Sequence, residues 1–191
     1  MKWTDKKPDI YAKPITQAFS EVPVLSLLEI LSSSIEAPHV FISDTVKKQI
    51  IEHITENETE SGGLLLGEVL SVDNLESGVV AVHVTKSIPS EDFDATSVSL
   101  CMGTAVWDTA RRHTTKSNFV VGWYHSHPNL GAFFSGTDRQ TQAAFFNKSY
   151  HLGLVIDPIR DEECWFVSGE SSPVPLTHVW SGYSELLASV I

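Results

Sequence analysis

The stretch Trp123-Tyr-His-Ser-His-Pro-Asn-Leu-Gly-Ala-Phe-Phe-Ser-Gly-Thr-Asp138 is the most informative part of this 191-residue chain. It places His125 and His127 two residues apart and brings Asp138 shortly after them. In a strand, residues i and i+2 point to the same face, so the two imidazoles would project together, and Pro128 would end the strand directly afterwards. Two imidazoles and one carboxylate form a ligand set suited to a catalytic zinc, which keeps its fourth position open for water.

The residues of this stretch, taken alone, leave a second interpretation open. A His-x-His pair is a weak signal, because either ring could be an ordinary surface histidine. Ser135 and Asp138 also fit a capping box, with Ser135 as the N-cap of a helix and Asp138 near its third position. Capping and metal binding are compatible, since a carboxylate in the first turn of a helix can still face an ion.

The overall composition limits the classes of function. The chain has 24 acidic and 13 basic residues and a net charge of -11, which argues against a nucleic-acid-binding protein. The two cysteines, Cys101 and Cys164, form neither a zinc-ribbon spacing nor a disulfide framework. No signal peptide or membrane-spanning run is evident, so we expect a cytoplasmic protein that does not enter a membrane.

The pattern along the chain divides it into an extension and a domain. Residues 1–38 contain four prolines and predict an N-terminal extension with one short helix, at Val24 to Ser32. Residues 39–191 predict a single domain, in which Val40 to Ser43 leads into the first helix. Interleaved strands and helices without a strict βαβ rhythm indicate a mixed α/β sheet domain. Apolar periodicity predicts helices at 44–57, 100–115, 136–147 and 181–190, strands at 60–70, 79–85, 119–125, 150–156 and 164–168, and a loop at 88–99.

Several separate motifs of the chain resemble those of the JAMM (MPN-plus) metalloproteases. The family signature is His-x-His-Pro followed by Ser-x-x-Asp, which corresponds here to His125-Ser-His-Pro128 and Ser135-Gly-Thr-Asp138. A second family pattern, Glu-x-x-Gly-Leu-x-x-Gly, matches Glu60-Ser-Gly-Gly-Leu-Leu-Leu-Gly67. Val121 to Tyr124 and Tyr150 to Pro158 are also similar to that family. The resemblance implies a mixed α/β, cytidine-deaminase-like MPN/JAMM domain, with a central, mostly antiparallel sheet flanked by helices.

The resemblance also implies roles for five residues. His125, His127 and Asp138 would bind one Zn²⁺ per chain, with water in the fourth position. Glu60 would be the general base, which takes the water proton and returns it to the leaving amine. Ser135 would help to hold the tetrahedral oxyanion. All of these polar residues are present, which argues against the metal-free MPN scaffolds that lack them.

The function implied by the resemblance is hydrolysis of an amide bond. The substrate would be a ubiquitin or ubiquitin-like protein, cut after its C-terminal glycine as a precursor or a conjugate. The substrate tail would run beside residues 90–101, which either order as a strand against it or form a plain loop. The setting would be a bacterial ubiquitin-like conjugation operon, including antiviral systems. The alternatives are a JAMM hydrolase of sulfur-carrier-protein metabolism and a non-catalytic MPN scaffold.

Overall fold

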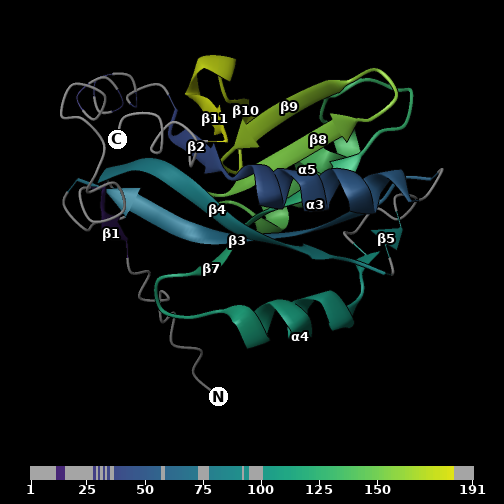
Figure 1. Ribbon diagram of the computed structural model, residues 1–191, viewed down its shortest axis with the longest axis horizontal. Helices are drawn as coiled ribbons and strands as arrows, with labels where there is room; N and C mark the ends of the chain where they lie inside the picture. Colours follow the sequence, from purple (N-terminus) through teal and green to yellow (C-terminus); the bar gives the residue numbers. More distant parts are fainter. Residues whose placement is uncertain are drawn as a thin grey trace.

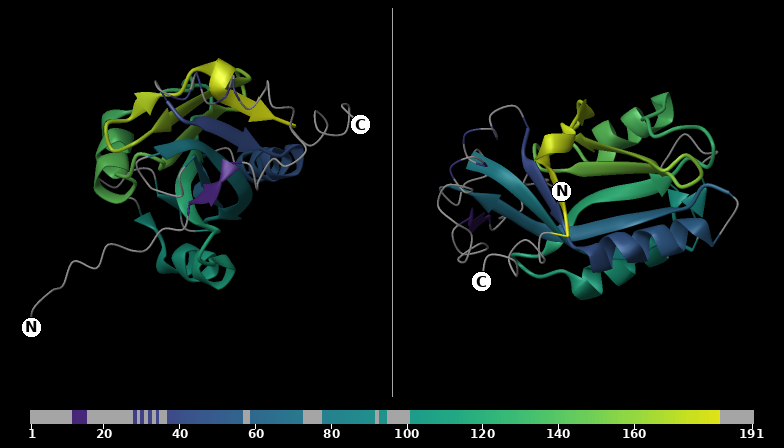
Figure 2. Two further views of the ribbon diagram at one scale, coloured as in Figure 1. Left: turned by 90° about the vertical axis from the view of Figure 1, so that its left-hand side faces the viewer. Right: turned by 45° about the horizontal axis from the view of Figure 1, so that its top comes forward.

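The computed structural model describes residues 12–15, 28, 30, 32, 34, 37–56, 59–72, 78–91, 93–94 and 101–182. Within these ranges, a strongly twisted mixed sheet of nine strands is flanked by three α-helices (Figures 1 and 2). The helices are α3 (Asp44–Thr55), α4 (Thr104–His113) and α5 (Gly136–Phe145), and a 3₁₀ turn, η2, spans Leu176–His178. The strands of the sheet are β1 (Lys13–Pro14), β2 (His39–Ile42), β3 (Gly62–Ser71), β4 (Val79–Pro89), β7 (Phe119–Ser126), β8 (Leu152–Asp157), β9 (Glu162–Val167), β10 (Ser172–Pro173) and β11 (Val179–Ser181).

The strand order of the sheet is β10-β9-β8-β7-β3-β4-β2-β11, and β1 pairs with β3. Antiparallel pairing joins the long strands β3, β4 and β7, and also joins β8 to β9 and β9 to β10. Parallel pairing joins β7 to β8, β4 to β2, β2 to β11 and β1 to β3. This arrangement confirms the predicted mixed α/β class with helices around a central sheet, and it places β7, the strand with the two motif histidines, between β3 and β8.

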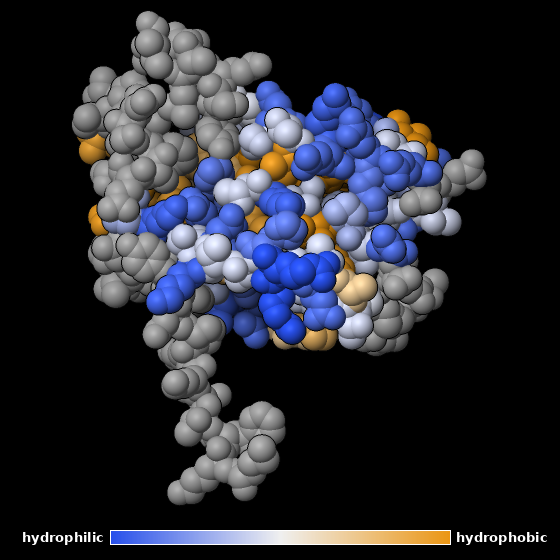
Figure 3. All heavy atoms as spheres, turned by 60° about the horizontal axis from the view of Figure 1, so that its bottom comes forward, coloured by the Kyte–Doolittle hydropathy of each residue, from blue (hydrophilic) through white to orange (hydrophobic). Residues whose placement is uncertain are grey.

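Strand β3 is apolar on both faces because both faces are covered. Leu65 belongs to the apolar cluster that contains the buried residues of α3, whereas Leu64 and Leu66 belong to the cluster that contains Val106 of α4. Successive side chains of a strand point to opposite faces, so the run of leucines fills two cores. The outer surface of α4 is hydrophilic (Figure 3).

Gly63 allows the close approach of neighbouring chain segments to β3. A Cβ atom at this position would overlap the carbonyl oxygen of Ile88 on β4 and the ring of Tyr124 on β7. The glycine at position 63 therefore reflects close packing of β3 against both neighbouring strands.

Most of the predicted elements are confirmed, and the differences lie at their ends. Cys101 and Met102, predicted to be helical, form the strand β6, and helix α4 begins only at Thr104. The N-cap of α3 is Ser43, whose side chain accepts from the backbone N–H of Val46 at 3.3 Å. The residues before it form the buried strand β2, which pairs with β4, because Val40, Phe41 and Ile42 gain more from burial in the sheet than from an irregular lead-in. Ser181, predicted to begin a helix, ends strand β11, and residues 183–190 of that helix lie outside the described residues. Strand β4 also continues to Pro89, into the segment predicted as a loop.

The described residues before position 39 pack on the sheet. Lys13 and Pro14 pair with Leu70 and Ser71 of β3, and Ile15 and Ile30 are buried in a third apolar cluster. The short helix predicted at Val24 to Ser32 falls mostly outside the described residues. No described helix is long and apolar enough to cross a membrane.

Candidate metal centre

The two motif histidines lie at the end of β7, where three strands meet. His125 pairs with Gly62 of β3 on one side and with Val155 of β8 on the other. The backbone N–H of His127 donates to the carbonyl oxygen of Ile156 at 2.9 Å, which ties the residue after the strand to β8. Both imidazoles therefore project from a rigid part of the sheet.

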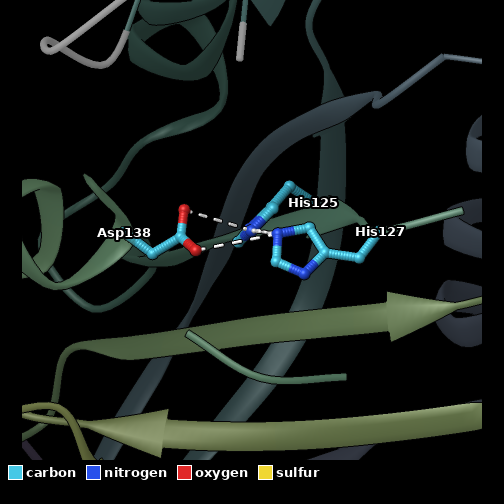
Figure 4. Close-up of side chains that lie close together, drawn as sticks. All are labelled: His125, His127 and Asp138. Atoms are coloured by element: carbon cyan, nitrogen blue, oxygen red, sulfur yellow. Dashed lines mark hydrogen bonds and ion pairs between the residues drawn. The ribbon is translucent and has the colours of Figure 1, made fainter. Parts of the chain in front are cut away.

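The side chains of His125, His127 and Asp138 converge on one point (Figure 4). The Nε2 atoms of the two histidines are 3.1 Å apart. Asp138 places Oδ1 3.3 Å from Nε2 of His125 and Oδ2 3.7 Å from Nε2 of His127. Donor atoms about 2.0–2.1 Å from a tetrahedral zinc lie about 3.3 Å from one another, so these separations suit such an ion. All three residues are buried, with exposed fractions of 1%, 4% and 8%.

Asp138 has two roles at once, because it also caps helix α5. The Ser135 hydroxyl accepts from the backbone N–H of Asp138 at 3.2 Å, and the Asp138 carboxylate accepts from the backbone N–H of Ser135 at 2.6 Å. The capping box predicted as an alternative is thus present, and it holds the carboxylate against the histidines. Ser135 itself lies beside Asp138.

Glu60 lies next to this cluster, just before β3. Its Oε1 is 3.9 Å from Nε2 of His127, and about a quarter of its side chain is exposed. The neighbouring residue, Ser61, is bound to β7: its N–H donates to the Ser126 hydroxyl at 3.0 Å, and its carbonyl accepts from the Ser126 N–H at 2.8 Å. Ser126 thus faces away from the histidines and ties the Glu60 segment to β7.

The electrostatics of the cluster favour the protonation states that bind a metal. Burial alone would raise the pKa of the Asp138 carboxyl, but the hydrogen bond and charge of His125 and the bonds from Ser135 lower it to about 2. Burial and the neighbouring His125 lower the pKa of His127, and the carboxylates of Asp138 and Glu60 only partly oppose them. At neutral pH the cluster therefore offers a carboxylate and a neutral imidazole, the forms that coordinate metals.

Each histidine is oriented by a further contact. Nδ1 of His127 is 3.3 Å from the carbonyl oxygen of Gly131, and because a carbonyl only accepts, Nδ1 carries the proton and Nε2 the lone pair. The ring of His125 stacks on Trp123, with centroids 4.6 Å apart and planes 7° apart. The indole N–H of Trp123 donates to the side-chain oxygen of Gln142 at 2.7 Å.

Trp123 and Gln142 also belong to this site, although neither was predicted from the sequence as a site residue. The period of two along β7 could have found Trp123, since it shares a strand face with His125. Gln142 follows Asp138 by one helical turn on α5, which places both side chains on the same face of that helix. Such residues support the ligands rather than contact an ion.

The segment predicted to border the substrate groove, residues 90–101, lies mostly outside the described residues. The backbone N–H of Ser90 donates to the carbonyl oxygen of Gly62 at 2.9 Å, and Gly62 is the strand partner of His125. Further along, β5 (Phe93–Asp94) pairs antiparallel with β6 (Cys101–Met102). The described ends of the segment are therefore anchored, at one end close to the metal centre.

The part of the chain that contains the candidate metal centre is similar to known proteins. A family model described as prokaryotic homologs of the JAB domain matches residues 43–168. Ubiquitin carboxyl-terminal hydrolase RPN11 of Saccharomyces cerevisiae is 32% identical over 127 residues, which cover 63% of this chain and 39% of that protein. COP9 signalosome complex subunit 5 of Drosophila melanogaster is 31% identical over 135 residues, which cover 64% of this chain and 38% of that protein.

Two further comparisons agree with these. The 26S proteasome non-ATPase regulatory subunit 14 of Dictyostelium discoideum is 30% identical over 130 residues, covering 65% of this chain and 40% of that protein. The chain thus spans about two fifths of the length of these relatives. The solution structure of a protein from Desulfitobacterium hafniense aligns with a TM-score of 0.52 and 19% identity, covering 74% of this chain and 92% of that one, and supports the fold alone.

Proposed function

Because the chain belongs to the family of prokaryotic homologs of the JAB domain, we propose that it is a zinc-dependent peptidase or isopeptidase. It cuts after the C-terminal glycine of a ubiquitin or ubiquitin-like protein. The observation that carries this proposal is the convergence of His125, His127 and Asp138, with Glu60 beside them. The name of one relative, a ubiquitin carboxyl-terminal hydrolase, supports the class of substrate.

The metal ligands follow from the donor atoms that face one another. His125 and His127 would hold one Zn²⁺ through Nε2, and Asp138 would hold it through a carboxylate oxygen. When bound, zinc would act as a Lewis acid: it would polarise a substrate carbonyl and lower the pKa of a coordinated water toward about 7. Two nitrogen donors and one oxygen donor leave a coordination position open, as catalytic zinc sites require.

Glu60 moves the proton that the reaction needs. Its carboxylate takes a proton from the attacking water as the new C–O bond forms at the substrate carbonyl carbon. It then gives that proton to the amide nitrogen as the C–N bond breaks, because an unprotonated amine is a poor leaving group. Oε1 lies 3.9 Å from Nε2 of His127, close to the ligands and partly open to solvent.

Ser135 would stabilise the oxyanion that develops on the substrate carbonyl. In the capping box its hydroxyl oxygen accepts from the N–H of Asp138, so the cap does not use its hydrogen. That hydrogen can be donated to the oxyanion, next to the carboxylate ligand.

The C-terminal tail of the substrate would run beside residues 90–101. A cavity of about 110 Å³ lies at the start of this segment, between the end of β4 and helix α4. The bond from Ser90 to Gly62 connects that region to the strand that pairs with His125. An extended substrate tail can add as a strand to such a segment through main-chain hydrogen bonds. If the segment instead remains a plain loop, it adds nothing to the affinity for the substrate tail.

Two other functions use the same fold. A hydrolase of sulfur-carrier-protein metabolism would have the same catalytic set, and neighbouring thiamine, molybdopterin or cysteine genes would indicate it. Genes for ubiquitin-like conjugation or antiviral defence would instead indicate the proposed pathway. A non-catalytic scaffold would bind no zinc and hydrolyse nothing.

The proposal is tested by incubating the protein with ubiquitin-like fusions and measuring the masses of the released fragments. We expect cleavage after the terminal glycine, inhibition by a chelator and loss of cleavage in Glu60→Gln. Cleavage that persists in Glu60→Gln, or in the presence of chelator, would contradict the assigned mechanism. Fusions that lack the terminal glycine serve as the matched control.

A further inference from the structure

A buried carboxylate, Asp157, lies one strand away from the ligand strand. It ends β8, directly after Ile156, whose carbonyl accepts from the backbone of His127. Its exposed fraction is 0%. A buried charge is costly unless it is well hydrogen-bonded, so the partners of Asp157 indicate what this charge is for.

Both oxygens of Asp157 accept from backbone N–H groups of two loops. Oδ1 accepts from Asn129 at 3.0 Å, from Ile159 at 3.0 Å and from Arg160 at 3.2 Å. Oδ2 accepts from Gly131 at 2.7 Å. Burial alone would raise the pKa of this carboxyl, but these four bonds lower it, so the group is ionised at neutral pH.

The loop held by Asp157 has a backbone that needs such support. Asn129 and Gly131 have φ angles of 61° and 95°, in the left-handed region that most residues avoid. A conformation of this kind persists when surrounding bonds fix it. Asp157 supplies two of those bonds, one on each side of Leu130.

The same loop orients a proposed metal ligand. The carbonyl oxygen of Gly131 accepts from Nδ1 of His127 at 3.3 Å, while the N–H of Gly131 donates to Asp157. The peptide groups on the two sides of one residue thus connect the buried carboxylate to the imidazole. A shift of Gly131 would release the ring and the tautomer that presents Nε2 to His125 and Asp138.

We propose that Asp157 is a positioning residue for the metal centre, which fixes His127 through Gly131. This inference rests on the proposed function, because it takes His127 as a zinc ligand. Asp157 does not contact the substrate or an ion; it determines where the ligand ring lies. Glu162 also accepts from this loop, from Ala132 at 3.3 Å, but its side chain is exposed and does not bond to Gly131.

The test is the zinc affinity of the Asp157→Asn variant, measured by competition with a chromophoric chelator. The four backbone partners are N–H donors, and so is the Arg160 guanidinium, whose Nε lies 3.6 Å from Oδ2; the amide NH₂ of the variant must therefore face a donor. We expect zinc affinity to fall by about 10- to 100-fold, the usual cost of losing a residue that supports a metal ligand. The Co²⁺-substituted protein should also show an altered visible spectrum. Glu162→Gln, which neutralises the β9 carboxylate that accepts from Ala132 of the same loop, is the matched control and should bind zinc as the wild type does.

Folding is measured separately, by urea unfolding of the metal-free proteins. A purely structural role would lower that stability but leave the zinc affinity of the folded protein unchanged, and this result would overturn the inference. If Asp157→Asn does not fold, the Gly131→Ala variant tests the inference instead. An alanine is strained at a φ of 95°, so this substitution should shift the Gly131 backbone that orients His127. Weaker zinc binding by folded Gly131→Ala supports the inference, and wild-type binding overturns it. Wild-type protein that binds no zinc would instead refute the proposed function, and the inference with it.

Discussion

Two pairs of buried histidines in this chain differ in what surrounds them. His125 and His127 form one pair, and His39 and His178 form the other, and no member is more than 6% exposed. The ring planes of the first pair are 74° apart. Their Nε2 atoms lie 3.1 Å from each other, and the carboxylate of Asp138 lies 3.3 Å from Nε2 of His125. The rings of the second pair are stacked, with centroids 4.2 Å and planes 17° apart.

The hydrogen bonds of the second pair go to neutral partners. Nδ1 of His39 accepts from the indole N–H of Trp180 at 2.9 Å, and Nδ1 of His178 donates to the carbonyl oxygen of Ala37 at 3.1 Å. Among the described residues, the one group able to hold a metal is His125, His127 and Asp138. Burial of two histidines is thus insufficient for metal binding, because the ring edges must also converge on a carboxylate.

The largest expected effect comes from removing a ligand of the first pair. Asp138→Asn or His125→Ala should reduce zinc from about one ion per chain to a trace and bring hydrolysis below detection, since three protein ligands define such a site. The His178→Gln variant, which changes the second pair, should keep both the bound zinc and the hydrolytic activity. Metal analysis by mass spectrometry checks this, and zinc retained after loss of both His125 and Asp138 would contradict it.

Loss of the proton carrier should separate binding from chemistry at the first pair. Glu60→Gln should bind zinc normally but hydrolyse about 10²- to 10⁴-fold more slowly, the usual contribution of a general base. Glu56→Gln, at the end of α3, is the control and should have wild-type activity. A steady-state assay at saturating zinc measures the difference, and comparable rates for the two variants would exclude Glu60 as the base.

A smaller effect is expected at the residue that caps α5. Ser135→Ala should lower kcat by about 10- to 100-fold, because the metal shares the stabilisation of the oxyanion. It should also cost about 1 kcal/mol of stability through loss of the cap. Ser135→Thr keeps a hydroxyl and should restore most of both quantities. If Ser135→Ala lost stability alone, the hydroxyl would have only its capping role.

The second pair should instead control stability against acid. Burial, together with the charge of His178, lowers the pKa of His39 to about 4 from 6.5. Protonation therefore favours the unfolded chain: the stability is complete above about pH 6.5 and is lost as the pH falls toward 4, by about 3 kcal/mol for this group. Urea unfolding of metal-free protein between pH 7 and pH 4.5 measures the loss, which His39→Gln should reduce. If the free energy of unfolding fell equally steeply with pH in the wild type and in His39→Gln, His39 would not be the group responsible.

The two pairs were not equally predictable from the sequence. The first pair lies within one motif, so local spacing and the period of a strand predicted that its two rings lie together, and the family resemblance is confirmed. The second pair depends on the parallel pairing of β2 with β11, which joins Trp180 to His39 across 141 positions. No local pattern contains that contact. The role of Asp157 was likewise not predictable, because two of its four partners, Asn129 and Gly131, become its neighbours only after β7 and β8 pair.

Zinc-edge anomalous diffraction from crystals grown with zinc tests the central claim most directly. The account predicts one anomalous peak per chain, about 2.0–2.2 Å from Nε2 of His125, from Nε2 of His127 and from a carboxylate oxygen of Asp138. The absence of a peak at this position, or a peak between His39 and His178, would contradict it.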